Sequence, residues 1–244
     1  MVSVCIATYN GEKYIIKQVQ SILNQLGAED EIIISDDGSA DNTLNLVKKM
    51  RDDRIKIING PCKGYIQNFA NAISHASGDY IFLSDQDDEW YINKIEIVLP
   101  FLQKFKMVMH NARFVDGDDN YLGEMLFKDS ISFSFWKNII KHQTYGCCLS
   151  FSSDLKSYIL PIPYNKHLLH ETWISGLCQL IYGNKSLCYL NMPLINYRRH
   201  GDNVSLLHSN RSYYIRIVER FVLLYHIIVR YIKCMIKRFY NKVF

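Results

Sequence analysis

Residues 2–9 (VSVCIATY), 31–37 (EIIISDD) and 80–88 (YIFLSDQDD) are three apolar runs, and each ends in polar side chains. Each apolar part is short and rich in residues that favour strands, so we predict a buried strand in each. Between the runs, apolar residues recur at helical spacing. The helical segments are residues 12–26, 41–50 and 65–75, and residues 55–58 form one more short strand pattern. This alternation predicts an α/β fold with a mostly parallel central sheet flanked by helices.

Polar clusters follow three of the predicted strands directly. Thr8-Tyr9-Asn10 follows the first strand, Asp36-Asp37 the second and Asp85-Gln86-Asp87-Asp88 the fourth. In open α/β sheets, ligands bind beyond the carboxyl ends of the strands, near the switch in strand order. We therefore expect all three clusters to lie at one ligand-binding edge of the sheet.

The last of these clusters places three carboxylates within four residues. Without a partner, Asp85, Asp87 and Asp88 would repel one another and raise one another's pKa. A divalent cation removes that repulsion, and carboxylate oxygens suit Mg²⁺ or Mn²⁺, which commonly hold substrate phosphates as well. The alternative is a solvated acidic turn. The position of the cluster directly after a buried strand favours the metal site.

Asp36 and Asp37 begin a segment that also has turn and capping residues. Gly38 can turn the chain, and Ser39 or Asp41 can cap the helix that follows. These structural roles leave the two aspartates unexplained. A carboxylate at this edge can accept a hydrogen bond from a uracil or thymine imide or from a ribose hydroxyl, so we predict a nucleotide contact.

The middle of the chain, residues 105–210, has weaker patterns. Strands are expected at 107–109 and 147–151, and a helical stretch at 167–182. Glu171 and Trp173 lie at the expected start of that helix, where an acid can also simply complement the helix dipole. Two arginines and a histidine precede a glycine turn further on. Arg198 and Arg199 suit phosphate, and His200 suits a metal ion, although surface roles remain the alternative.

Charge and cysteine content exclude several classes of protein. The formal net charge is +4, but the 34 residues from Arg211 onwards contain eight Lys or Arg and one acid, so the preceding body is net negative. A nucleic-acid-binding protein usually carries its positive charge on the folded body, so we expect no nucleic-acid partner. Seven cysteines without a C-x-x-C pair, and no leader pattern, predict a reducing, cytoplasmic setting.

The last segment, residues 213–244, has a helical pattern that is both apolar and basic. Its longest stretch without Lys, Arg, Asp or Glu, residues 221–229, is far shorter than the roughly 20 apolar residues of a bilayer-spanning helix. We expect a basic amphipathic helix on the inner face of the cell membrane. Packing on the globular domain or in a dimer is the alternative. The predicted division is a globular domain over 1–210 and a tail over 211–244.

Taken together, the motifs resemble those of the inverting glycosyltransferases of family 2. Residues 2–10 are similar to that family's first strand and nucleotide loop, and residues 36–43 (DDGSADNT) to its base-binding motif. Residues 78–90 (GDYIFLSDQDDEW) resemble the metal-binding motif of its rhamnosyltransferase-like branch. The branch also carries His-Asp-Trp-Trp and Tyr-Arg-x-His-Gly-x-Asn motifs, which residues 170–173 and 197–203 approximate.

This resemblance implies the GT-A fold, a Rossmann-like architecture, with a nucleotide-sugar-binding half over 1–104 and an acceptor half over 105–210. It implies that Asp87 ligates Mn²⁺ or Mg²⁺, with His200 as a second metal or diphosphate contact, and that Glu171 is the catalytic base. Gly146 and Cys147 match a loop beside the donor sugar. Asp88, Trp173, Arg198 and Arg199 are further candidates. The nucleotide sugar is expected on Thr8, Tyr9, Asn10, Asp36, Asp37, Asp85 and Gln86.

The implied reaction transfers a sugar from a nucleotide diphosphate to a hydroxyl of a glycan or a lipid-linked oligosaccharide, as in capsule or O-antigen assembly. The branch favours rhamnose from dTDP-rhamnose, with UDP-hexoses next. The sequence departs from the branch in three places: Glu171 stands where Asp is usual, Thr172 where Trp is common, and Asn111 where many members have Asp.

Two other functions compete with this interpretation. A nucleotidyltransferase usually has a glycine-rich loop with a basic residue after the first strand, which Thr8-Tyr9-Asn10-Gly11-Glu12 lacks. A non-catalytic module that binds sugar nucleotides would not need the acidic pair Asp85 and Asp87 together with Glu171.

Overall fold

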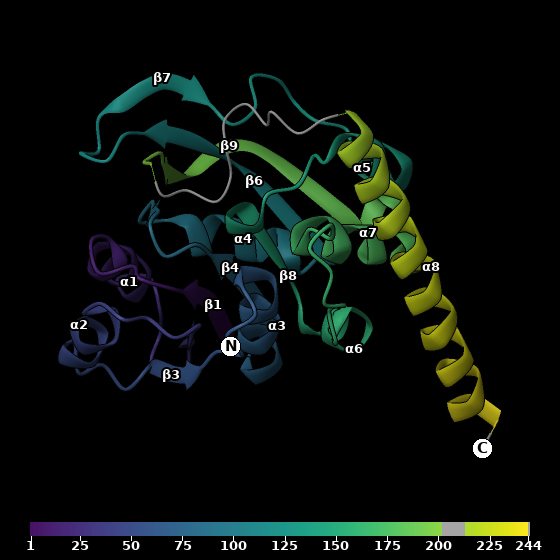
Figure 1. Cartoon of the computed structure of the whole chain (residues 1–244), viewed down its shortest axis with the longest axis horizontal. Helices are drawn as coiled ribbons and strands as arrows, with labels where there is room; N and C mark the ends of the chain where they lie inside the picture. The colour runs from purple at the N-terminus through teal and green to yellow at the C-terminus, as the bar shows by residue number, and fades with distance from the viewer. Residues whose placement is uncertain (202–212, 244) are drawn as a thin grey trace.

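The structure is a computed structural model that describes residues 1–201 and 213–243. Four parallel strands form its N-terminal half, in the order β3-β2-β1-β4 (Figure 1). These are β1 (Val2–Thr8), β2 (Glu31–Asp36), β3 (Ile55–Asn59) and β4 (Tyr80–Ser84). Helices α1 (Ile15–Leu23), α2 (Thr43–Lys49) and α3 (Tyr65–His75) connect them. The alternation predicted from the sequence is therefore confirmed.

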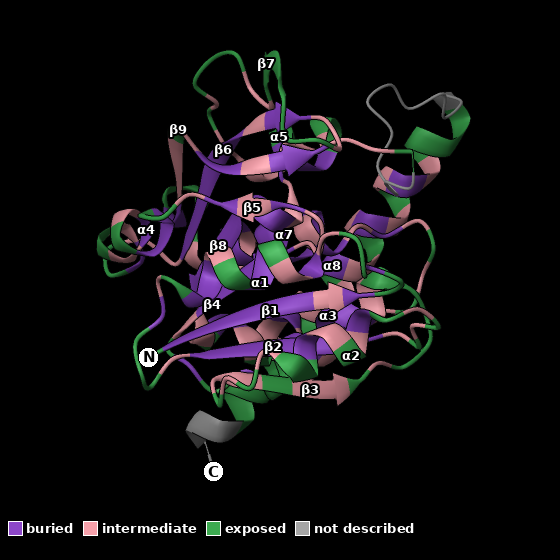
Figure 2. Cartoon of the chain, turned by 90° about the vertical axis from the view of Figure 1, so that its left-hand side faces the viewer, coloured by how far each residue is buried: buried purple, intermediate pink, exposed green. Residues whose placement is uncertain are grey.

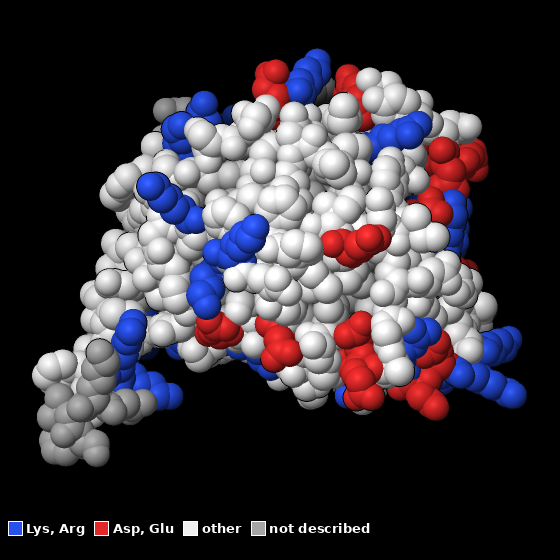
Figure 3. Space-filling model, turned by 180° about the vertical axis from the view of Figure 1, so that it is seen from behind, with Lys and Arg blue, Asp and Glu red and all other residues white. Residues whose placement is uncertain are grey.

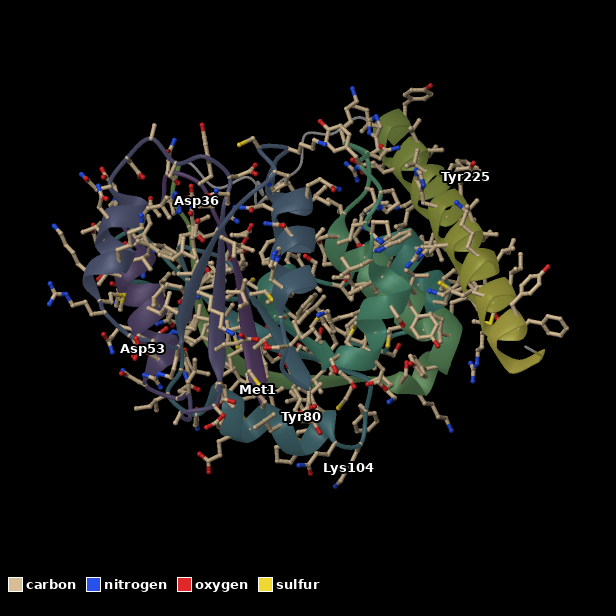
Figure 4. The ribbon with its side chains drawn as sticks, turned by 90° about the horizontal axis from the view of Figure 1, so that it is seen from below. Met1, Asp36, Asp53, Tyr80, Lys104 and Tyr225 are labelled. Carbon is tan, nitrogen blue, oxygen red and sulfur yellow. The ribbon has the colours of Figure 1, made fainter. Side chains whose placement is uncertain are left out.

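The three inner strands of this half, β1, β2 and β4, are mostly buried, as near-continuous apolar runs require, whereas the edge strand β3 is partly exposed. Every residue of β2 is buried, and β1 has one partly exposed residue, Ala7 (Figure 2). Figure 4 shows the direction of the sheet: Met1 and Tyr80 mark the beginnings of β1 and β4, and Asp36 marks the end of β2 at the opposite edge.

The second half of the chain extends the same sheet with antiparallel and parallel neighbours. β8 pairs antiparallel with both β4 and β6, and β9 pairs parallel with β6, so the complete sheet is mixed. The added strands are β5 (Glu89–Trp90), β6 (Met107–Val115), β7 (Tyr121–Met125), β8 (Leu149–Ser152) and β9 (Leu187–Arg198). The sequence patterns indicated parts of β6 and β8 only. β7 is exposed throughout and β9 alternates irregularly, so neither has a clear apolar period.

The remaining helices lie mostly in this second half. They are α4 (Lys94–Leu102), α5 (Phe135–Lys141), α6 (Lys156–Ile159), α7 (His170–Tyr182) and α8 (Tyr213–Val243), with short 3-10 turns at Gly146–Cys148, Ser153–Leu155 and Asn184–Ser186. The helix expected over 167–182 is confirmed, and it begins at His170. Trp173 lies inside the core, where its indole N–H donates to the Ile159 carbonyl at 2.9 Å.

The tail helix α8 packs along α5, α6 and α7 (Figure 1). Leu223 and Ile227 are its buried apolar residues. Ile227 occupies the space beside Gly176 of α7, where a Cβ would come within 2.6 Å of the isoleucine Cδ1. Contact with the globular domain, the alternative in the sequence analysis, is therefore present. The motif residues Asp202 and Asn203, and the tail's Arg211 and Phe244, lie outside the described residues. In the part of the chain that is described, none of the helices combines the length and apolar character needed to cross a bilayer.

The contact between α7 and α8 predicts a measurable stability difference. Ile227→Ala should lower the free energy of unfolding by about 2–5 kcal/mol, because a fully buried side chain leaves a cavity when it is truncated. Ile228→Ala, at the exposed next position, should change it by less than about 0.5 kcal/mol. Chemical denaturation followed by circular dichroism measures both. Equal effects would show that α8 does not pack on α7 in solution.

Candidate functional site

The carboxyl ends of β1, β2 and β4 bring the three predicted polar clusters to one edge of the sheet. Thr8 is in register with Asp36, at the last residues of β1 and β2. The loops beyond β1 and β4 are joined by the Gln86 side chain, which accepts from the Tyr9 N–H at 2.9 Å and donates to the Tyr9 carbonyl at 3.1 Å. Gln86 therefore positions the loop that carries Tyr9.

The two aspartates after β2 have different surroundings. The Asp36 carboxylate accepts from the Thr8 hydroxyl at 3.0 Å and from the Ser39 N–H at 2.9 Å, so it closes the turn that follows β2. Asp37 accepts from the Gly64 N–H at 2.7 Å through Oδ2. Its Oδ1 is buried and has no hydrogen-bond partner within residues 1–201 and 213–243. Among the described residues, Asp37 is therefore the member of the pair with an unused acceptor atom, because both carboxylate oxygens of Asp36 accept hydrogen bonds.

Asn10 and Tyr9 complete this part of the edge. Asn10 links the two loops, because its Oδ1 accepts from the Ala40 N–H at 2.9 Å and its own N–H donates to the Ser39 hydroxyl at 2.8 Å. The Tyr9 side chain is 58% exposed. The structure thus presents an aromatic ring and an unpaired carboxylate oxygen at the loop edge, with Asn10 and Asp36 maintaining the loops.

In the acidic cluster after β4, Asp87 is partly exposed and Asp88 is buried. The Asp87 Oδ2 lies 2.8 Å from the Nε2 of His200, which the chain brings from beyond the end of β9. Asp88 is 2% exposed and accepts from the Arg198 N–H at 3.1 Å. Burial, and then the charge of Asp87, raise the pKa of Asp85 to about 7. The same two causes hold the pKa of Asp88 well above its ordinary value.

Arg198 is engaged within the protein. Its side chain is 1% exposed, its Nε donates to the Asp87 carbonyl at 2.8 Å, and it forms an ion pair with Asp119 at 2.6 Å. A third bond reaches the Asp116 carbonyl at 3.2 Å. Arg198 therefore positions the acidic loop and has few donors left for a phosphate. Arg199, which is half-buried, extends over the rings of Phe114 and Tyr197.

Lys94 is a charged residue of this region that the sequence analysis missed. Its side chain is fully buried, with Nζ 3.6 Å from the centre of the Trp90 ring and 3.3 Å from the Cys147 carbonyl, to which it donates. Burial lowers the pKa of Lys94 to about 8, while Asp88 and Asp85 act to raise it. The buried ammonium group of Lys94 thus lies close enough to the acidic cluster to interact with it electrostatically.

A sequence signal for Lys94 existed. Ile95, Val98 and Leu102 form the buried stripe of α4, and Lys94 is four residues before Val98 on the same face. A lysine at a core position of a helix is rare unless its charge has a partner. Asn111, by contrast, has a structural role, because its amide donates to the Phe127 carbonyl at 2.8 Å and to the Asn191 side chain at 2.9 Å.

Two groups of side chains could hold a metal ion. Asp85, Asp88 and Cys147 offer ligand atoms that lie within 4.8 Å of one another. However, the neighbouring Cys148 and burial hold the pKa of the Cys147 thiol well above its usual range, and a protonated thiol is a poor ligand for Mg²⁺ or Mn²⁺. Asp87 and His200 place a carboxylate oxygen and an imidazole nitrogen 2.8 Å apart. This pair, with Asp85 beside it, fits an oxygen-preferring cation better.

The predicted base, Glu171, lies in the first turn of α7 and is paired with its neighbour. Its Oε2 is 3.0 Å from Nδ1 of His170, whose ring stacks on Phe69 at a centroid distance of 4.6 Å. Gly146 leaves room for this ring, since a Cβ there would come within 2.7 Å of the His170 Nε2. Burial raises the pKa of Glu171, but the charge and contact of His170, together with a backbone N–H and the charge of His142, lower it, so its net pKa is below the ordinary value.

Glu171 and the acidic cluster lie close to each other. The charge of Glu171 contributes to the raised pKa of Asp85, and His170 acts on Asp85 in the opposite direction. The site therefore joins the edge of the parallel half to the start of α7. It contains the exposed ring of Tyr9, the buried Oδ1 of Asp37, the Asp87–His200 pair and the partly buried Glu171.

Comparisons with known proteins show similarity to glycosyltransferases. The family model described as glycosyl transferase family 2 matches residues 3–158. WfaP of Escherichia coli, a UDP-Glc:alpha-D-GlcNAc-diphosphoundecaprenol beta-1,3-glucosyltransferase, is 28% identical over 84% of this chain and 80% of its own length. WfgD of Escherichia coli, which has the same described activity, is 30% identical over 60% of this chain. The dTDP-rhamnosyl transferase RfbG of Shigella flexneri is 42% identical over 37% of this chain and 34% of its own length.

Among solved structures, S. aureus TarS 1-349 in complex with UDP-GlcNAc superposes with a TM-score of 0.67 and 19% identity, over 89% of this chain and 66% of that one. The TarS complex with UDP gives a TM-score of 0.65 over 81% of this chain. These neighbours have the GT-A fold, which confirms the predicted fold class. The chain spans 58% of the length of WfgD and 60% of the UDP-bound TarS chain.

The network around Arg198 predicts that even a conservative substitution will be costly. Arg198→Lys keeps the charge but cannot retain the three bonds of the guanidinium, so it should destabilise the protein by roughly 3 kcal/mol. Arg199→Lys, the matched control, should cost less than about 1 kcal/mol, because among the described residues its guanidinium lies against the ring faces of Phe114 and Tyr197. Thermal unfolding compares the two variants. A smaller effect at Arg198 than at Arg199 would contradict the positioning role.

Proposed function

The chain belongs to glycosyltransferase family 2, and we propose that it transfers a sugar from a nucleoside diphosphate to an acceptor hydroxyl by a single, metal-dependent displacement with inversion. The observation that carries the proposal is the convergence of Asp37 and Tyr9, the Asp87–His200 pair and Glu171 on one edge of the sheet. Family membership favours a sugar-transferring enzyme over the nucleotidyltransferase alternative.

The donor binds, in this proposal, at the loops after β1, β2 and β4. The exposed Tyr9 ring stacks on the base, and the unpaired Asp37 Oδ1 accepts from the base imide or a ribose hydroxyl. The Thr8 backbone borders the base, and Asp85 faces the ribose or the donor sugar. The UDP and UDP-GlcNAc complexes of TarS support a nucleotide sugar as the ligand of this fold.

Asp87 and His200 would hold the divalent cation, Mn²⁺ or Mg²⁺. When bound, the cation neutralises the charge that develops on the diphosphate as it leaves. The carboxylate–imidazole contact of 2.8 Å and the neighbouring Asp85 provide the oxygen and nitrogen donors for it. Arg198 and Gln86 act indirectly, by positioning the acidic loop and the Tyr9 loop.

Glu171 acts as the general base on the acceptor side. It takes the proton of the acceptor hydroxyl while the oxygen attacks the anomeric carbon from the face opposite the diphosphate, and this geometry inverts the anomeric centre. His170 keeps the Glu171 carboxylate ionised and oriented. Gly146 and Cys147 border the donor sugar through the 3-10 turn that begins at Gly146.

The proposed acceptor is a glycan or a lipid-linked oligosaccharide in cell-surface polysaccharide assembly, at the cytoplasmic face of the membrane. The activities of WfaP and WfgD on a diphosphoundecaprenol-linked sugar support a lipid-linked acceptor. The donor is proposed to be dTDP-rhamnose, which the similarity to RfbG supports, or else a UDP-hexose, which the two glucosyltransferases support. Residues 1–104 form the donor half and residues 105–210 the acceptor half.

A base variant tests the proposed reaction. Glu171→Gln should lower the rate of transfer about 10²–10⁴-fold, because an amide cannot accept the acceptor's proton. Binding of the donor with Mn²⁺, measured by calorimetry, should be unchanged. Transfer from dTDP-rhamnose and UDP-glucose to a lipid-linked acceptor is followed by mass spectrometry.

Glu124→Gln is the control for this experiment, since Glu124 is an exposed acid on β7. It should leave both binding and transfer unchanged. An unaltered transfer rate in Glu171→Gln would remove Glu171 as the base. Loss of donor binding in that variant would instead move Glu171 to the donor side of the site.

The pH profile tests the pairing of His170 with Glu171. A base works in its ionised form, and the pKa of Glu171 is below the ordinary 4.5, so the acidic limb of kcat/KM should lie below about pH 4.5. His170→Gln removes the attraction that lowers this pKa and leaves burial, which raises it. The acidic limb should therefore move to higher pH in the variant. A limb at the same pH would show that His170 does not act on the base.

A further inference from the structure

The outer face of α8 carries one unbroken row of exposed apolar and aromatic side chains, here called the apolar stripe. Its members are three or four residues apart, the spacing that places side chains on a single face of a helix. Each is at least 36% exposed, and Phe221 reaches 70%. The apolar stripe comprises Ile217, Phe221, Tyr225, Ile228, Ile232 and Ile236. Figure 4 shows Tyr225 on the side of α8 that is turned away from the sheet.

The opposite face of α8 is firmly attached to the globular domain. Leu223 and Ile227 are buried against it. Arg220 donates from Nε to the Ile140 carbonyl at 3.1 Å, and Arg230 donates to the carbonyls of Tyr158 at 2.7 Å and Ser157 at 2.9 Å. These contacts fix the rotation of α8 about its own axis. The apolar stripe therefore faces outward as a consequence of the packing, and turning it inward would break the arginine bonds.

The exposed charge of α8 is positive. Arg216, Lys233, Lys237 and Arg238 are exposed, whereas the single acid of the helix, Glu219, is 4% exposed. On the face drawn in Figure 3, several Lys and Arg side chains lie at the lower left, the side of the molecule where α8 lies. An apolar stripe with basic flanks complements a surface that is apolar inside and anionic outside.

We propose that α8 is a membrane-docking element that lies in the interface of an anionic lipid bilayer, with the apolar stripe at the boundary of headgroups and acyl chains. The exposed lysines and arginines contact the anionic headgroups. A second copy of this chain fits the apolar stripe less well than a bilayer does, because two such helices packed face to face would bring like charges together. Docking itself is independent of the transfer reaction; its link to a lipid-linked acceptor rests on the proposed function.

Vesicle flotation with the full chain tests the proposal. The protein should float with vesicles of phosphatidylcholine and phosphatidylglycerol and much less with phosphatidylcholine alone, and high salt should reduce the bound fraction. The triple variant Phe221→Ser, Ile228→Ser, Ile232→Ser should have an affinity for the anionic vesicles at least about tenfold lower, because it loses three side chains that partition into the interface. Its circular dichroism spectrum should be unchanged, since these positions are exposed.

The matched control replaces exposed apolar residues outside α8, in the double variant Ile92→Ser, Met192→Ser. It should float like the wild-type protein. Equal flotation of the triple variant and the wild type, or no flotation of the wild type with anionic vesicles, would overturn the proposal. So would a wild-type dimer in light scattering that the triple variant loses, because that would assign the stripe to a second copy.

An activity measurement separates this proposal from the proposed function. With an acceptor that carries no lipid, the triple variant should transfer sugar at the wild-type rate. Absence of transfer in both proteins, with normal flotation of the wild type, would refute the function and leave the docking surface standing. Loss of flotation with normal transfer in the triple variant supports docking alone.

Discussion

The burial of several carboxylates at one strand edge is the constraint on which the rest of the site depends. Glu171 raises the pKa of Asp85, and Asp85 raises that of Asp88, in surroundings of low dielectric constant, where like charges are costly. The parallel half of the sheet provides the aspartates but none of the cations near them. Lys94 and His170 come from α4 and α7, and the cations of β9 and its end come from still further along the chain.

This dependence explains why the second half of the chain must fold around the first. Arg198 donates to the backbone beside Asp87 and pairs with Asp119, and in this way it connects β9, the acidic loop and the loop before β7. Lys94 lies below the same loop, against Trp90. The second half of the chain, through α4, α7 and β9, brings these side chains to the carboxylates. An isolated N-terminal half would leave the acids without them.

The sequence predicted the parallel half well, because there the decisive patterns are local. A buried parallel strand is a continuous apolar run, and the ligand edge follows from the direction of the strands. The second half was predicted in part only, since β7 is exposed and β9 has an irregular burial pattern. Single residues were harder still. The sequence pattern predicts that the two arginines before Gly201 contact phosphate. In the structure, however, Arg198 donates to backbone carbonyls of residues some 80 and 110 positions away. Trp173 is similarly part of the core, bonded to Ile159.

The close approach of Gly176 to Ile227 makes α7 a shared element of two different surfaces. The same helix carries the His170–Glu171 pair in its first turn and, five residues after the glutamate, the glycine that receives α8. A movement of α8 relative to the sheet must therefore either open a void at Gly176 or carry α7 with it, because close-packed contacts transmit displacement. The orientation of Glu171, the proposed base, and the attachment of the outermost helix are thus mechanically linked through one residue that has no side chain.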